Sequence, residues 1–230
     1  MGTVALAVAL VVYNNLANRW PPFNRAWFVP ANLFVCAVVL WLAFSDRKLD
    51  LSSSDVWGPA SPVGPGIVGL GIGLAIVAPL FLMARSTRWS RFIEDKRVEH
   101  LTGAGLLYQT LLRIPVGTAL LEEVAFRGVL FGAWRPSGVV GAAVYSSIAF
   151  GLWHISPTVN LVKANRPGAS ASATTKVVLG AVVFTTAAGL GLVWLREITE
   201  SLAAPLVLHS VVNALATVAA VTAHRRERPA

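Results

Sequence analysis

The chain has 230 residues, of which 55% are hydrophobic and only 13% are charged, with a net charge of +8 and a mean hydropathy of +0.65. Soluble domains carry about 25% charged residues, so this composition excludes an ordinary soluble protein and indicates a membrane protein. The positive charge does not indicate a nucleic-acid partner, because no helix-turn-helix, zinc finger or aromatic-basic platform accompanies it.

Apolar stretches long enough to cross a bilayer, which takes about 20 helical residues, recur along the chain. They predict an all-α, polytopic membrane bundle with about seven transmembrane helices, at residues 3–18, 26–44, 63–84, 115–134, 138–156, 177–195 and 202–223. The first stretch lacks the basic leader and the cleavage site of a signal peptide, so we expect a retained helix there. The single cysteine, Cys36, lies inside the second stretch and allows neither a disulfide within the chain nor a thiolate metal cluster.

The segment 101–114 differs from the spans because it mixes leucines with Gln109 and Arg113. Joined to the next span, it would form a helix too long for one crossing. Pro115 follows directly, and proline breaks or bends a helix. We therefore predict a short interfacial amphipathic helix here, leading into a span that starts near residue 115.

Lysine and arginine are unevenly distributed between the loops. If the N-terminus lies outside, most of them fall in the loops that face the cytoplasm, where anionic lipid attracts them. The positive-inside rule therefore predicts an external N-terminus and a cytoplasmic C-terminus. Residues 1–100 should hold transmembrane helices and a basic cytoplasmic loop, residues 101–223 a helical core, and residues 224–230 a basic cytoplasmic tail.

Two adjacent carboxylates, Glu122 and Glu123, interrupt the fourth apolar stretch, and Arg127 follows closely. A charged side chain at the centre of a membrane helix costs roughly 2.5–3.5 kcal/mol on insertion scales, so ionisable residues there mark functional sites. Glu123 and Arg127 are four residues apart and share one side of a helix. This spacing favours an ion pair between them and leaves Glu122 toward a cavity, although Arg127 could instead reach Glu122.

Three further polar residues fall inside predicted spans. His154 lies near the end of the fifth span, and His209 and Asn213 share one face of the seventh. The predicted topology places Glu122, Asn213 and, less closely, His154 at neighbouring depths in the cytoplasmic half, with His209 about one turn nearer the centre. We therefore expect Glu122, His154, His209 and Asn213 to line one cavity that opens toward the cytoplasm.

A carboxylate, two imidazoles and an amide are groups that can activate water. The glutamate can act as a general base, a histidine can share the water, and a histidine with an asparagine can donate to a developing oxyanion. The set Glu122, His154 and His209 could instead bind a zinc ion with water in the fourth position, although no His-Glu-x-x-His motif is present. Phe150 and Trp153, on the same span as His154, are expected to pack beside the cavity, which Trp153 could line.

Taken together, these residues resemble the motifs of a known family. Glu-Glu-x-x-x-Arg (Glu122, Glu123, Arg127), Phe-x-x-x-His (Phe150, His154) and His-x-x-x-Asn (His209, Asn213) occur in this order on three predicted membrane helices. This order is similar to that in the CPBP family of CAAX-prenyl proteases and bacteriocin-processing proteins, also called Abi proteins. The resemblance covers about residues 108–220.

The resemblance implies an intramembrane endopeptidase that acts on a peptide or a membrane-anchored protein in the lipid bilayer. It implies that Glu122 and His154 activate water and that His209 and Asn213 form the oxyanion site, with no cofactor. A zinc-dependent mechanism, as the family was first described, is the alternative. Prenylated CAAX tails, bacteriocin leaders and membrane-anchored regulators are all compatible substrates.

Two other functional classes fit the same residues. The chain could be a catalytically silent membrane scaffold or immunity protein, as some relatives of such proteases are. It could also be a proton-coupled transporter, because glutamate and histidine sets relay protons in membranes. The sequence shows no inverted repeat and no pair of broken helices, which disfavours transport.

Overall fold

The computed structural model describes residues 2–86 and 88–227, and all regular structure within this part of the chain is helical. The all-α prediction is therefore confirmed. The longer helices are α1 (Thr3–Ala17), α2 (Phe28–Ser45), α4 (Val63–Ala84), α8 (Val139–Trp153), α9 (Ile155–Asn165), α10 (Ala171–Thr199) and α11 (Ala203–Glu227). Short helical segments connect them: η1 (Phe23–Trp27), α3 (Ser53–Trp57), η2 (Ser90–Phe92) and η5 (Arg135–Ser137).

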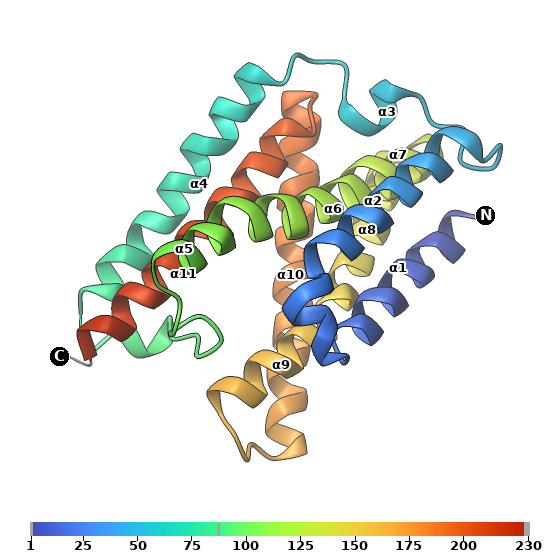
Figure 1. Ribbon diagram of the computed structural model, residues 1–230. Coiled ribbons are helices and arrows are strands. Elements are labelled where there is room, and N and C mark those ends of the chain that lie inside the picture. The colour runs from blue at the N-terminus through green and yellow to red at the C-terminus, as the bar shows by residue number, and fades with distance from the viewer. Residues whose placement is uncertain (1, 87, 228–230) are drawn as a thin grey trace.

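One helix runs without interruption from Gly103 to Trp134 and crosses the middle of the molecule (Figure 1). It consists of α5 (Gly103–Tyr108), η3 (Gln109–Ala119), α6 (Leu120–Glu122), η4 (Glu123–Leu130) and α7 (Phe131–Trp134), of which η3 and η4 are π-helical. The predicted break at Pro115 is wrong, because Pro115 lies inside η3. The wider π turns accommodate a residue that has no N–H to donate to the usual helical pattern.

Within residues 2–86 and 88–227, five helices are long and apolar enough to cross a membrane, so the chain is a multi-pass membrane protein of the predicted kind. They are Phe23–Ser45, Val63–Ala84, Val139–Asn165, Ala171–Thr199 and Ala203–Arg226. α1 is apolar but shorter, and the central helix carries Glu122, Glu123 and Arg127. The total of seven crossings, which needs both of these helices, remains a prediction.

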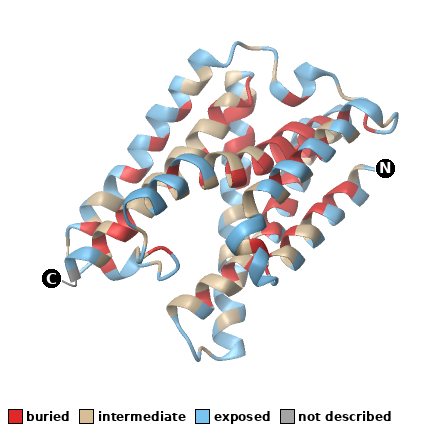
Figure 2. Cartoon of the chain, in the orientation of Figure 1, coloured by how far each residue is buried: buried red, intermediate tan, exposed pale blue. Residues whose placement is uncertain are grey.

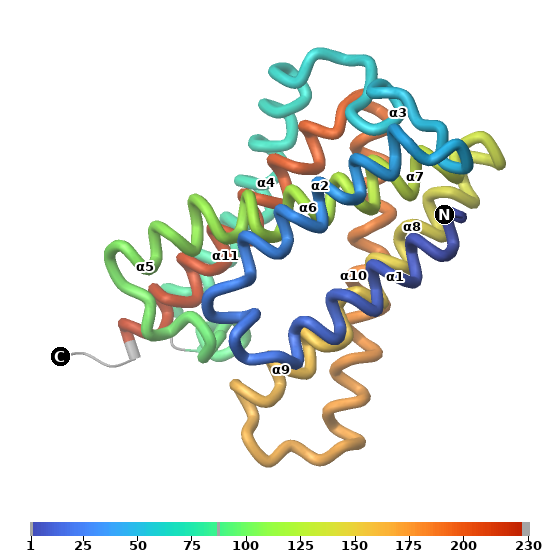
Figure 3. Tube along the Cα trace, turned by 45° about the vertical axis from the view of Figure 1, so that its right-hand side comes forward, coloured from blue at the N-terminus to red at the C-terminus, as the bar shows by residue number. Residues whose placement is uncertain are grey.

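The helices pack around the central helix, which contacts α2, α8 and α11 (Figures 1 and 3). α4 packs along α11, α10 along α8, and α1 against α8 and α9. Gly69 on α4 allows the closest approach to α11, because a Cβ atom there would collide with the carbonyl group of Ala204. Every residue of η4 is buried (Figure 2), so the carboxylate and the guanidinium that it carries lie in the core of the bundle.

The connections between helices gather at two opposite ends of the bundle (Figures 1 and 3). Residues 46–62, 135–138 and 200–202 lie at one end, and residues 18–22, 85–102 and 166–170 lie at the other. The second end holds most of the basic loops. It is also the end at which α8 gives way to α9, and so the end nearest to His154.

Candidate active site

Three helical segments bring the predicted residues together. Glu122 ends α6 and Glu123 begins η4 on the central helix, His154 lies between α8 and α9, and His209 and Asn213 lie on α11. Helical geometry separates the two glutamates, because adjacent residues of a helix point in different directions.

Glu123 is fully buried and forms the centre of an ionic network. Its Oε1 atom accepts a hydrogen bond from Nη1 of Arg127 at 3.1 Å and lies 2.7 Å from Nδ1 of His209. The side chains of Arg127 and Glu123 are 1% and 0% exposed. The predicted pairing of Glu123 with Arg127, rather than of Glu122 with Arg127, is confirmed.

Glu122 has a different environment. Its Oε1 atom accepts a hydrogen bond of 3.0 Å from the indole Nε1 of Trp153. Its Oε2 atom has no hydrogen-bond partner among the described protein atoms and lies 3.9 Å from Nε2 of His154 and 3.8 Å from Nε2 of His209. The tryptophan therefore fixes one carboxylate oxygen and leaves the other facing two imidazole rings.

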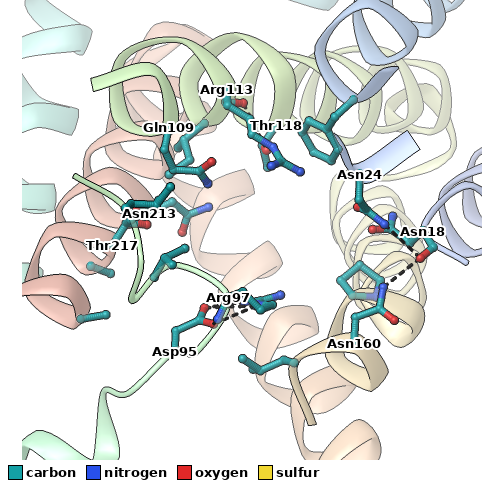
Figure 4. A pocket seen from close by; sticks show the side chains of 18 of the residues that line it. Asn18, Asn24, Asp95, Arg97, Gln109, Arg113, Thr118, Asn160, Asn213 and Thr217 are labelled. Carbon is teal, nitrogen blue, oxygen red and sulfur yellow. Dashed lines mark hydrogen bonds and ion pairs between the residues drawn. The ribbon is translucent and has the colours of Figure 1, made fainter. Parts of the chain in front are cut away.

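A cavity of about 1120 Å³ lies against this carboxylate. Glu122, Trp153, His154 and Asn213 line it, together with basic and polar side chains from the loops at the second end of the bundle: Arg19, Arg25, Arg97, Asn18, Asn24 and Asn160. Figure 4 shows Asn213 and Gln109 on one side of the cavity, Asn18 and Asn160 on the other, and the Asp95–Arg97 pair between them. The volume is slightly above the range of about 300–1,000 Å³ that is typical of ligand pockets.

Two predicted residues lie beside the cavity rather than in its wall. Phe150 is 3% exposed, and the guanidinium carbon of Arg127 stands 3.9 Å from the centre of its ring. Its physical role is to provide an apolar, π-rich surface for a buried cation. His209 is 8% exposed and stands between Glu122 and Glu123, so it reaches the site through those two carboxylates.

Asn213 is the predicted residue that is least connected to the others. Its side chain faces the cavity, and its backbone carbonyl oxygen accepts a hydrogen bond from the Thr217 hydroxyl at 2.9 Å. Asn213 therefore shares the cavity with Glu122 and His154 and is placed to meet a bound substrate.

The hydrogen bonds of the two histidines assign their ring nitrogens. Nδ1 of His154 lies 2.7 Å from the carbonyl oxygen of Phe150, which can only accept, so Nδ1 is the donor. A neutral His154 then presents the lone pair of Nε2 toward Glu122. Nδ1 of His209 faces the carboxylate of Glu123 and is a donor for the same reason, so Nε2 of His209 can donate only when the ring is protonated on both nitrogens.

The zinc alternative requires three ligands around one point. Among the described residues, no group of three histidine, cysteine, aspartate or glutamate side chains is arranged to hold a metal ion. Glu122, His154 and His209 come closest, because their facing atoms lie 3.8 and 3.9 Å apart.

Two asparagines near the end of α1 line the cavity but were not predicted from the sequence. Asn14 and Asn18 are buried, and both line the cavity. Their signal was available, because three asparagines close an otherwise apolar stretch at positions 14, 15 and 18. Polar residues in such a stretch must find partners, as ionisable ones do.

Comparison with known proteins gives one match. Residues 104–215 match a family model described as "Type II CAAX prenyl endopeptidase Rce1-like". No curated protein and no solved structure matches the chain. The matched segment contains Glu122, Glu123 and Arg127, both histidines of the site and Asn213. This Rce1-like segment supports a CPBP family intramembrane protease.

Proposed function

We propose that the chain is an intramembrane endopeptidase that hydrolyses a peptide bond of a membrane-associated substrate with water activated by Glu122 and His154. The observation that carries the proposal is the buried Oε2 atom of Glu122. It has no partner among the described protein atoms, it faces two imidazoles, and it adjoins a cavity large enough for a peptide.

Hydrogen bonds to Glu122 and His154 leave one acceptor atom free on each of these two side chains. Because Trp153 donates to Oε1 of Glu122, Oε2 keeps its lone pairs for the proton of an attacking water molecule. Because Phe150 accepts from Nδ1 of His154, a neutral His154 offers Nε2 as a second acceptor. The proton that Oε2 of Glu122 takes from water can then pass to the leaving amine through Nε2 of His154, which returns Glu122 to its charged form and His154 to its neutral form.

The oxyanion of the tetrahedral intermediate needs donors aimed into the same cavity. Asn213 can donate through its side-chain amide. His209 can contribute a donor from Nε2 as an imidazolium, a form that is stabilised by the carboxylates of Glu122 and Glu123 at 3.8 and 2.7 Å. Arg127 keeps Glu123 in place and balances its charge.

We propose that the substrate enters from the cytoplasm. Arg19, Arg25 and Arg97 line the cavity and lie in or next to the basic connections at the second end of the bundle. The positive-inside rule assigns these connections to the cytoplasm and places the N-terminus outside. The same basic side chains suit a substrate that lies near anionic lipid headgroups.

The test is cleavage of a fluorogenic reporter peptide by the purified protein in lipid vesicles. Turnover that depends on Glu122 supports the proposal. If no membrane-anchored peptide is cleaved and a pH gradient drives solute flux instead, the protein is a transporter. If a partner protein binds equally well to the wild type and to Glu122→Gln and no cleavage occurs, the protein is a scaffold. Either of these two results contradicts the proposal.

A further inference from the structure

The active-site histidine lies at a break between two helices. α8 ends at Trp153, α9 begins at Ile155, and the backbone of His154 has φ −86° and ψ 3°. In a continuous helix, the carbonyl of Trp153 would accept from the N–H of residue 157. That residue is Pro157, which has no N–H, so the carbonyl of Trp153 needs another donor.

Asn14 of α1 supplies this donor. Its Nδ2 atom lies 2.7 Å from the carbonyl oxygen of Trp153, and the contact is buried. Asn18, one turn further along α1, donates to the side-chain oxygen of Asn14 at 2.8 Å and so fixes the orientation of its amide. The side chain of Asn160 on α9 donates to the carbonyl oxygen of Asn18 at 2.8 Å.

A second backbone hydrogen bond of the helix is missing at this break, and the side chain of Asn15 replaces it. In a continuous helix, the N–H of Ser156 would donate to the carbonyl of Leu152. Instead, Nδ2 of Asn15 donates to the carbonyl of Leu152 at 3.0 Å, and Oδ1 of Asn15 accepts from the N–H of Ser156 at 2.7 Å. The amide is thus inserted into the helical hydrogen-bond ladder, which is a recognised cause of sharp helix kinks. The Ser156 hydroxyl also donates to the carbonyl of Asn15 at 2.9 Å, which ties the break to the α1 backbone.

Both residues at this break face Glu122. Trp153 donates to Oε1, and Nε2 of His154 lies 3.9 Å from Oε2. If the Asn15 amide were removed, the N–H of Ser156 could return to the carbonyl of Leu152 and reduce the bend, while Pro157 would still keep the carbonyl of Trp153 out of the helical ladder. That change would rotate the following residues about the helix axis and move the His154 ring away from Glu122.

We infer that Asn14 and Asn15 are positioning residues that hold Trp153 and His154 against Glu122. They act through the α8–α9 backbone and do not touch the reacting atoms. α1 lies outside the segment 104–215 that matches the family, so this chain supplies the support from its own N-terminal helix. The consequence for activity rests on the proposed function, whereas the position of the His154 ring does not.

The experiment compares the wild type with Asn15→Leu and Asn14→Leu. The matched control is Asn32→Leu on α2, because Asn32 is also buried and donates to a helix carbonyl, that of Gly117, at 2.7 Å. Asn14→Leu and Asn32→Leu each leave a buried carbonyl without its side-chain donor, so these two variants should lower the melting temperature to a similar degree. Asn15 is only half-buried, so Asn15→Leu should lower the melting temperature less. Only the two α1 variants should lower kcat, by about 10- to 100-fold with little change in KM, because misplacing a catalytic group by about 1 Å costs up to about 10²-fold.

A second measurement does not need activity. The chain has four histidines, so histidine-selective isotope labelling gives few ring signals. The His154 ring signal should move in Asn15→Leu, while the ring signal of His224, which lies 3.4 Å from Glu99 at the far end of α11, should stay in place. An unchanged His154 signal with wild-type kcat in Asn15→Leu would overturn the inference, as would an equal loss of kcat in Asn32→Leu. A wild type that cleaves no peptide would refute the proposed function alone, and the His154 signal would still decide the inference.

Discussion

The buried pair of Glu123 and Arg127 makes a quantitative prediction about stability. In Glu123→Gln, the amide oxygen can still accept from Arg127 and His209, so the hydrogen-bond geometry is kept and the negative charge is lost. Arg127 is 1% exposed, and its remaining close support is the face of Phe150 at 3.9 Å. Leaving a buried charge without its partner costs about 3–5 kcal/mol.

This loss should appear as a lower melting temperature. A change of 1 kcal/mol shifts the melting temperature of a chain of this size by about 2–4 °C, so Glu123→Gln should melt roughly 6–20 °C below the wild type. The chain provides its own reporter, because Cys36 is its only cysteine and is 5% exposed. A fluorogenic maleimide added during heating therefore reacts as the protein unfolds.

Two controls make the prediction specific to the buried charge. In Glu123→Gln/Arg127→Met both charges are absent, so the melting temperature should recover toward the wild type. In Arg135→Gln an exposed ion pair with Glu197 is lost, and exposed pairs contribute only about 0–1 kcal/mol. The reasoning is refuted if Glu123→Gln melts within a few degrees of the wild type, or if Arg127→Met gives no recovery.

Three further predictions concern the oxyanion, the metal and the topology. Asn213→Ala should lower turnover by about 10²- to 10³-fold and leave the melting temperature unchanged, because we propose that this side chain donates to the oxyanion. Wild-type turnover in this variant would remove Asn213 from that role. A strong chelator should leave peptide cleavage intact; loss of activity that zinc restores would instead assign Glu122, His154 and His209 to a metal ion. Reporter domains fused at the C-terminus and inserted within residues 45–62 should report opposite sides of the membrane, and the same side for both would contradict the predicted topology.

Features that depend only on local spacing along the chain were predicted correctly, namely several helices and one ion pair. Apolar stretches of membrane-spanning length predicted α2, α4 and α11, with bounds close to those observed. The spacing of four residues between Glu123 and Arg127 predicted their ion pair, because such residues lie on one side of a helix even in a π-helical segment.

Other features depend on contacts between distant parts of the chain and could not be read from one segment. Pro115 was expected to end a helix, but π turns in the structure carry the helix past it. The depth of His209 suggested a place in the cavity wall, whereas its ring stands between Glu122 and Glu123. Nothing local to Asn15 shows that its amide bridges a break that lies 137 residues further along the chain.

The central claim is that Glu122 is the base that activates water, and one variant tests it most directly. Glu122→Gln keeps the oxygen that accepts from Trp153, but a neutral amide cannot take the proton of an attacking water molecule. The measurement is cleavage of the reporter peptide in lipid vesicles, compared with the wild type at equal folded concentration, as checked by the Cys36 melting curve. Complete loss of turnover with an unchanged melting temperature is the predicted result, and full turnover in Glu122→Gln would contradict the account.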